Sequence, residues 1–189
     1  MREGFNKLII GFVFLFFDFR LQNIDVLPDP IGYLFIFLGM TALMGFIKEF
    51  EQSRNIAIVL LVLSIPGVIN IKHGVDLSTN NGLTSSFDLG YMFVLGILTS
   101  ILSVVLMYYL FIGISRKAKF HNFYDLARLS HVTWVLVLVI NIGLYTTMLI
   151  PFIAIPLILG GLGVLVLEFV VLTKAKNAFI NLETSEIIE

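Results

Sequence analysis

The sequence contains no cysteine, and only 13% of its 189 residues are charged. Without cysteine, the protein cannot form disulfides, use thiolate catalysis, carry a lipid on cysteine or bind a metal through cysteine. Soluble domains have about 25% charged and about 45–50% apolar residues. Here 58% of the residues are hydrophobic, so there are too few charged side chains to cover a water-facing surface. We therefore expect a protein that folds in a lipid bilayer.

The hydrophobic residues form long blocks and not short alternating segments. Alternation is typical of transmembrane β-barrels, whereas long apolar blocks are typical of transmembrane helices, which pair their backbone groups internally. We predict an all-α, polytopic membrane protein with one domain, a bundle of six transmembrane helices. The predicted spans are residues 5–22, 31–47, 55–71, 89–114, 131–150 and 156–174.

The first apolar run follows a basic start, as in a signal peptide. No small-x-small cleavage site follows this run, because the next residues are Asp18, Phe19, Arg20 and Leu21. We therefore expect the run to be retained as the first helix. In the sixth span, the glycines at 160, 161 and 163 are interpreted as allowing a close approach of another helix.

Lysine and arginine are distributed unevenly over the two sides of the predicted membrane domain. Ten of the twelve fall on the side that holds both termini, residues 48–54 and residues 115–130. These ten are Arg2, Lys7, Lys48, Arg54, Arg116, Lys117, Lys119, Arg128, Lys174 and Lys176. Because basic loops remain in the cytoplasm, both termini are predicted to be cytoplasmic. A five-span chain would instead mix the basic segments. Residues 115–130 are also interpreted as an interfacial helix that holds anionic lipid headgroups.

Polar and charged residues gather toward the opposite, outer side. Asp18 and Arg20 would lie about 16 and about 20 Å along the first helix from Lys7, within a hydrocarbon layer about 30 Å thick. A charge at that depth costs at least about 2.5–3.5 kcal/mol and therefore faces the bundle interior or a wet cavity. We predict an outward-facing pocket that binds a ligand. Its candidate residues are Asp18, Arg20, Asp25, Asp29, Tyr33, Asn70, Asp88 and Asn141.

Structural roles are the alternative for several of these residues. Asp29, which precedes a proline, and Asp88 can each cap the start of a helix. Asp18 and Arg20 can form an interfacial ion pair that ends a short helix.

Glu168 is the one acidic residue well inside the sixth span. It lies about 9 Å along the helix before Lys174. An ionisable residue inside a membrane is a functional candidate by default, and we predict proton or ion coupling for this carboxyl group. The alternative is a structural acid, either protonated or paired with Arg116 or Arg128.

Motifs of known enzymes are absent from the sequence. It contains no H-E-x-x-H, G-x-S-x-G, Walker A or dinucleotide-binding pattern. The histidines, at positions 73, 121 and 131, do not cluster. We therefore expect no catalytic residue, no metal site, no cofactor and no nucleic-acid partner, and an enzyme is disfavoured, although an intramembrane acid–base site stays open.

Residues 18–39 resemble the opening of a group of small multi-pass membrane proteins of Gram-positive bacteria. The matching positions are Asp18, Arg20, Asp25, Leu27, Pro28, Asp29, Ile31, Gly32 and Tyr33. This resemblance implies a bacterial cell membrane and no particular activity. The length and six-helix layout are also similar to the substrate-binding subunits of energy-coupling-factor vitamin transporters, which have an outward-facing pocket. The chain lacks their Ala-x-x-x-Ala pattern in the first helix, so that similarity is one of layout only.

Two functions fit these observations. The first is an integral membrane protein that binds or transports a small polar solute or ion through the outward pocket. The second is a non-catalytic regulatory, immunity or assembly protein in which the same charges bind a membrane protein partner. In both, the lipid bilayer surrounds the chain. A solute that stabilises the protein would favour the first, and copurification with a specific partner would favour the second.

Overall fold

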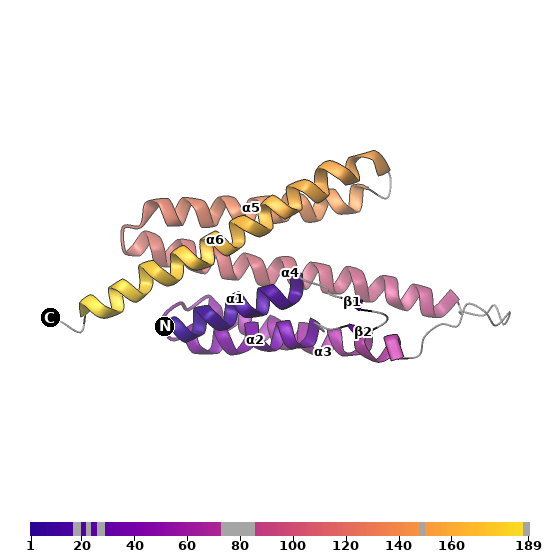
Figure 1. Ribbon diagram of the computed structural model, residues 1–189, viewed down its shortest axis with the longest axis horizontal. Helices are drawn as coiled ribbons and strands as arrows, with labels where there is room; N and C mark the ends of the chain where they lie inside the picture. Colours follow the sequence, from indigo (N-terminus) through magenta and orange to yellow (C-terminus); the bar gives the residue numbers. More distant parts are fainter. Residues whose placement is uncertain (17–19, 22–23, 26–28, 73–85, 148–149, 187–189) are drawn as a thin grey trace.

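The computed structural model is all-helical apart from one very short hairpin (Figure 1). It describes the backbone of residues 1–16, 20–21, 24–25, 29–72, 86–147 and 150–186, and the side chains of residues 1–16, 29–65, 93–147 and 150–182. The helices in this part of the chain are α1 (Arg2–Phe16), α2 (Asp29–Leu43), α3 (Phe50–Lys72), α4 (Ser86–Phe120), α5 (Tyr124–Thr146) and α6 (Ala154–Glu186). The hairpin is β1 (Arg20–Leu21) and β2 (Ile24–Asp25), and the 3-10 turn η1 (Pro151–Ile153) precedes α6. The all-α prediction is confirmed.

Three of the helices are long and apolar enough to cross a membrane. Within the described residues these segments are Phe93–Phe120, Tyr124–Thr146 and Pro151–Leu182, and α2 is a shorter apolar helix. Large apolar side chains are exposed on the outside, among them Val94 (63% exposed) and Ile155 (71%). Soluble monomers rarely expose contiguous apolar patches larger than a few hundred Å². The chain is therefore a membrane protein, with lipid as the solvent that fits this surface.

Helices α4 and α5 both extend into the segment that was predicted to connect them. Helix α4 continues to Phe120, and α5 already begins at Tyr124. The predicted interfacial helix over 115–130 is therefore wrong, because these residues belong to the two long helices and a tight turn between them. In that turn Asn122 has a φ of 62°, a left-handed conformation that asparagine tolerates better than most residues.

The first helix is shorter than predicted. Helix α1 ends at Phe16 and not at residue 22. Arg20 lies in β1, directly opposite Asp25 of β2 in an antiparallel pair, so its predicted place in the first helix is wrong. A charged residue within a membrane helix is costly, which is a physical reason for the helix to end before Arg20. Asp18 lies outside the described residues.

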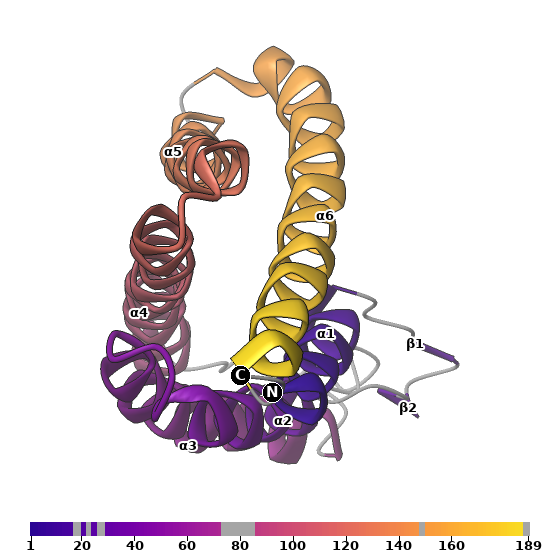
Figure 2. The same ribbon diagram turned by 90° about the vertical axis from the view of Figure 1, so that its left-hand side faces the viewer.

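The six helices form a closed ring (Figure 2). Each helix packs against the next one along the chain, and α6 returns to pack against α1. The helices alternate in direction, so both chain termini lie at the same end of the bundle, on the left in Figure 1. We call this the terminal end; it also holds the turns after α2 and α4. The opposite end, toward β1, β2 and η1, is called the far end.

The apolar core lies in the half of the ring nearer the terminal end. Phe5 of α1, Leu110 of α4 and Phe179 of α6 are all 0% exposed. The Phe179 ring lies 6.0 Å from that of Phe5 and 5.4 Å from that of Phe46, which is in the turn after α2. These three rings, the basal aromatic cluster, join three separate parts of the chain. The half of the ring nearer the terminal end is thus filled by packed apolar side chains.

Buried hydroxyl groups join α4 to α5. Ser115 Oγ donates a hydrogen bond to the carbonyl oxygen of Ala127 at 2.8 Å, and Ser130 Oγ donates to that of Phe111 at 2.8 Å. The two bonds run in opposite directions across the same pair of antiparallel helices. Serine and threonine are common between membrane helices because their hydroxyl groups can form hydrogen bonds with the backbone of a neighbouring helix.

Helices α1 and α2 approach each other so closely that their contact requires glycine. A methyl group added at Gly11 would lie 2.8 Å from the carbonyl oxygen of Gly32, and one at Gly39 would lie 2.9 Å from that of Gly4. Backbone atoms cannot rotate away as a side chain can. By contrast, nothing lies within 4 Å of a methyl group added at Gly163. The predicted close approach at the glycines of α6 is therefore weaker than this one between α1 and α2.

We expect Gly11→Ala and Gly39→Ala to destabilise the protein by about 1–3 kcal/mol each, the usual cost of overpacking. The matched control, Gly163→Ala, has free space and should be neutral or stabilise α6 by up to about 1 kcal/mol, because alanine is the better helix former. Thermal unfolding in detergent measures all three. Equal melting temperatures for Gly11→Ala and Gly163→Ala would contradict the close contact.

Candidate functional site

A cavity of about 560 Å³ lies among five of the six helices, in the half of the ring toward the far end. We call it the central cavity. Its wall contains the last residues of α1, the first turns of α2 and parts of α4, α5 and α6. Most of the wall is apolar. The polar side chains that reach it are Asp29, Tyr33, Ser103, Asn141 and Glu168.

A second cavity, of about 440 Å³, adjoins the first. The two share four lining residues, Asp29, Tyr33, Ser103 and Asn141. The second cavity extends toward α3 and the first half of α4, where it adds the hydroxyl groups of Ser64, Thr99 and Ser100. The polar groups thus lie at the junction of two hollow regions, which is where a bound solute would have the most room.

The structure brings together four residues that the sequence singled out. Asp29, Tyr33 and Asn141 were predicted to bind a ligand, and Glu168 was predicted to couple a proton or ion. They come from α2, α5 and α6 and meet at one cavity. Their assembly depends on the ring, since these helices are far apart in the sequence.

The other predicted ligand residues are not placed at the central cavity. Arg20 and Asp25 lie opposite each other in the β1–β2 hairpin. Asn70 lies in α3 and Asp88 in α4, but their side chains are outside the described part of the chain, as is all of Asp18. Their roles as ligands stay predictions.

Asp29 lies in the first turn of α2 and not at the N-cap considered for it, and its role as a ligand stays a prediction. Helix α2 begins at Asp29, one residue earlier than a cap ahead of a first helical proline would place it. A carboxylate in the first turn still interacts favourably with the positive end of the helix dipole. The same side chain lines both cavities, so helix stabilisation and a place in the site are compatible.

Ser103 is a site residue that sequence reasoning missed. Its Oγ lies 3.3 Å from the hydroxyl oxygen of Tyr33, a hydrogen bond that joins α4 to α2 where the two cavities meet. No motif surrounds this serine, and serines are frequent in membrane helices. Only the position of α4 against α2 in the ring shows that Ser103 belongs to the site.

Asn141 offers an acceptor to the cavity. Its Nδ2 donates to the carbonyl oxygen of Val137 at 2.9 Å, one turn back in α5. No hydrogen bond to its side-chain oxygen is found among the described residues. An amide oxygen can accept two hydrogen bonds, so this group can serve a ligand without breaking an existing contact.

Glu168 is the most unusual group in the site. Only 3% of it is exposed, and its Oε2 is buried without a hydrogen-bond partner in the described structure. The predicted alternative of a pair with Arg116 is wrong, because Arg116 Nη1 contacts Glu49 Oε1 at 3.0 Å at the terminal end. Arg128, the other suggested partner, is exposed. A buried polar group without a partner is costly.

The ionisable groups described in the wall of the central cavity are all acids, apart from Tyr33. Among its described lining residues are two acids, Asp29 and Glu168, and no lysine, arginine or histidine. Low-dielectric walls strengthen the potential of such groups. The described wall is thus complementary to a positively charged group or a hydrogen-bond donor.

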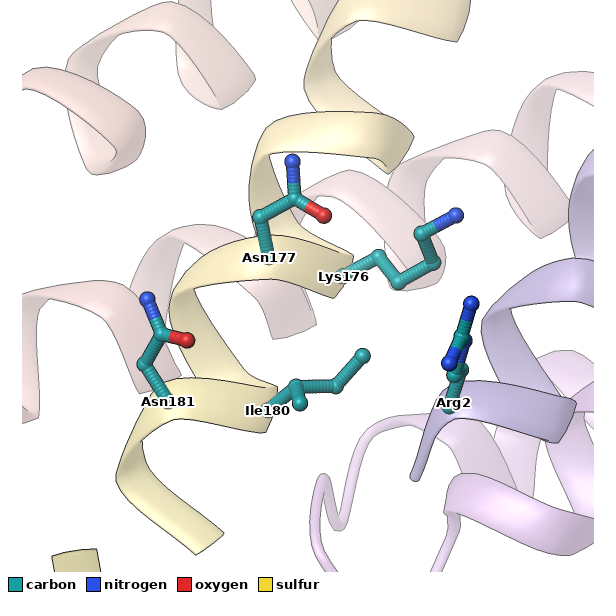
Figure 3. A pocket seen from close by; sticks show the side chains of 5 residues that line it. All are labelled: Arg2, Lys176, Asn177, Ile180 and Asn181. Carbon is teal, nitrogen blue, oxygen red and sulfur yellow. The ribbon is translucent and has the colours of Figure 1, made fainter. Parts of the chain in front are cut away.

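A different pocket, of about 470 Å³, lies at the terminal end between the start of α1 and the last turns of α6 (Figure 3). It is lined by Arg2, Lys176, Asn177, Ile180 and Asn181. Lys176 Nζ donates to Asn6 Oδ1 at 3.3 Å, which ties α6 to α1. This pocket is basic where the central cavity is acidic, and it contains none of the residues predicted to bind a ligand.

Comparison with protein-family models, curated proteins and solved structures finds no match to this chain. The functional conclusion therefore depends on the geometry of the site. The resemblance of residues 18–39 to a group of Gram-positive membrane proteins stays a prediction.

We expect Tyr33→Phe and Ser103→Ala each to lower the free energy of unfolding by about 0.5–1.5 kcal/mol, because each removes the same hydrogen bond. The double variant should cost little more than either single variant. Tyr109→Phe is the control, since its ring contact with Tyr108 survives the change. A double-mutant cycle from chemical unfolding measures the coupling, and fully additive effects would contradict the bond.

Proposed function

We propose that the protein is a multi-pass membrane protein that binds a small solute in the central cavity, as a transporter or as the solute-binding part of one. The observation that carries this proposal is the convergence of polar groups from four helices, α2, α4, α5 and α6, on one apolar-walled cavity. Its size is within the range of about 300–1,000 Å³ that is usual for small-molecule sites. A merely structural bundle would have no need of such a space.

All six helices cross the bilayer in this proposal. Helices α1 and α2 have 15 residues each, which corresponds to about 22 Å against a hydrocarbon thickness of about 30 Å. Short spans are accommodated by local thinning of the bilayer or by polar flanking residues that reach the interface. The tight pairing of α1 with α2 also shields their backbones from lipid.

The terminal end lies in the cytoplasm in this proposal, because ten of the twelve basic residues belong to it by sequence position. The central cavity, in the half toward the far end, is then on the outer side. The basal aromatic cluster of Phe5, Phe46 and Phe179 separates it from the cytoplasm. This arrangement corresponds to an outward-facing state, and passage of a solute would require the cluster to separate.

Fusions test the orientation. Green fluorescent protein fused to the C-terminus should fluoresce, and alkaline phosphatase at the same place should be inactive, since the phosphatase matures only outside the cytoplasm. Phosphatase fused after residue 80 should be active, because the polar segment at 72–88 follows the third predicted span. The opposite pattern of activities would overturn the orientation and the outward direction of the cavity.

A solute screen tests the binding function. The purified protein in lipid nanodiscs is heated with members of a library of small solutes. A ligand at 100 times its dissociation constant should stabilise the protein by about 2.7 kcal/mol and raise the melting temperature by about 5–10 °C for a chain of this size. Asn141→Leu should abolish the shift, because it removes a polar group of the cavity.

The matched control is Asn177→Leu, which changes an exposed asparagine of α6 at the terminal end. It should respond to the solute as the wild type does. If the solute protects the wild type, Asn141→Leu and Asn177→Leu equally, it binds outside the central cavity. If no solute of the library protects the wild type, the proposed function fails and a protein partner becomes the better explanation.

A further inference from the structure

We infer that the solute of the central cavity is an organic cation, an amine with an apolar body, and that Glu168 is the counter-ion of its ammonium group. This inference rests on the proposed function, because it names the class of solute that the same cavity takes. Four observations on the described residues support it: a buried carboxyl group whose Oε2 has no hydrogen-bond partner, a wall without basic groups, an apolar lining and the lack of a cluster of three or more acidic, histidine or cysteine side chains.

The carboxylate is the first observation. Only 3% of Glu168 is exposed, and no described residue forms a hydrogen bond with its Oε2. Intramembrane acids pair with a cation or serve an ion or substrate pathway. The two arginines that might have paired with it are at the terminal end, one of them bound to Glu49. A cation that pairs with Glu168 would therefore come from outside the described part of the chain.

The wall of the cavity has no described basic residue and is mostly apolar, which are the second and third observations. No lysine, arginine or histidine is among its described lining residues, so a cation would meet no repulsion there. Most other lining side chains are hydrocarbon, for example Met107, Ile140 and Leu165. Such walls bury an alkyl or aromatic body by the hydrophobic effect. The free amide oxygen of Asn141 is a further acceptor for N–H groups.

The small number of acidic side chains in the described wall distinguishes an organic cation from a divalent metal ion. Calcium takes about six to eight oxygen ligands, and magnesium about six. Within the described residues no group of three or more acidic, histidine or cysteine side chains could hold a metal ion. An ammonium group needs only about three acceptors, and its apolar body fits a wall that would leave a metal ion unsolvated.

Three probes with the same aromatic body test the charge preference. They are 2-phenylethylammonium, the neutral 2-phenylethanol and the anionic 3-phenylpropionate, each titrated into the protein in nanodiscs by calorimetry. The ammonium probe should bind at least about tenfold more tightly than the alcohol, which corresponds to one charge-assisted hydrogen bond, and the anion should bind least.

Variants test the assignment to Glu168. Glu168→Gln keeps the shape of the side chain and removes its charge, so it should abolish the preference for the ammonium probe over the alcohol. Glu168→Asp keeps the charge and should keep the preference with weaker binding. Glu51→Gln, an exposed acid in the first turn of α3, is the matched control and should leave all three affinities unchanged.

The outcomes separate this inference from the proposed function. If the alcohol or the anion binds as tightly as the ammonium probe, and Asn141→Leu weakens that binding, the cavity binds solutes but the cation inference is overturned. Retention of the ammonium preference by Glu168→Gln overturns it as well. If none of the probes binds and Glu168→Gln only raises the melting temperature, Glu168 is a protonated structural acid; the solute library then decides separately whether the proposed function also fails.

Discussion

The contact of α6 with α1 at the terminal end is the interaction on which the site depends. Phe179 packs on Phe5, and Lys176 donates to Asn6, so the last helix closes the ring against the first. Toward the far end, the last residues of α1, Leu15 and Phe16, line the central cavity together with α6. The ring is therefore packed with apolar side chains where these two helices meet at the terminal end, and the central cavity lies where α1 ends.

Lipid as the solvent explains where the polar groups are. The outside of the bundle exposes large apolar residues, and the polar residues inside are satisfied by neighbouring backbones, as Ser115 and Ser130 are. Two buried side-chain atoms in the described structure have no such partner, His121 Nε2 and Glu168 Oε2. His121 lies at the terminal end, stacked on Phe46. Of these two residues only Glu168 lines the central cavity, where its unpaired oxygen could bind a ligand.

Sequence reasoning was accurate where composition decides the structure and wrong where local contacts decide it. The long apolar blocks predicted six helices, and six are present in the described chain. The end of α1 was wrong because hydrophobicity does not show where a charged segment leaves a helix. The separate helix at 115–130 was wrong because charge does not end a helix, whereas the turn at Asn122 does. The close packing of Gly11 on Gly32 was missed, because its two members are on different helices.

The sequence by itself determined that this chain folds in lipid, that it is helical, and which polar residues are too costly to face hydrocarbon, because these properties depend on side-chain transfer energies alone. Asp29, Tyr33, Asn141 and Glu168 were found in that way. Only the tertiary structure decided that these four share a cavity with Ser103, and that no arginine among the described side chains lies beside Glu168. Those facts depend on the order and rotation of the helices around the ring, which are set by packing between segments far apart in the chain.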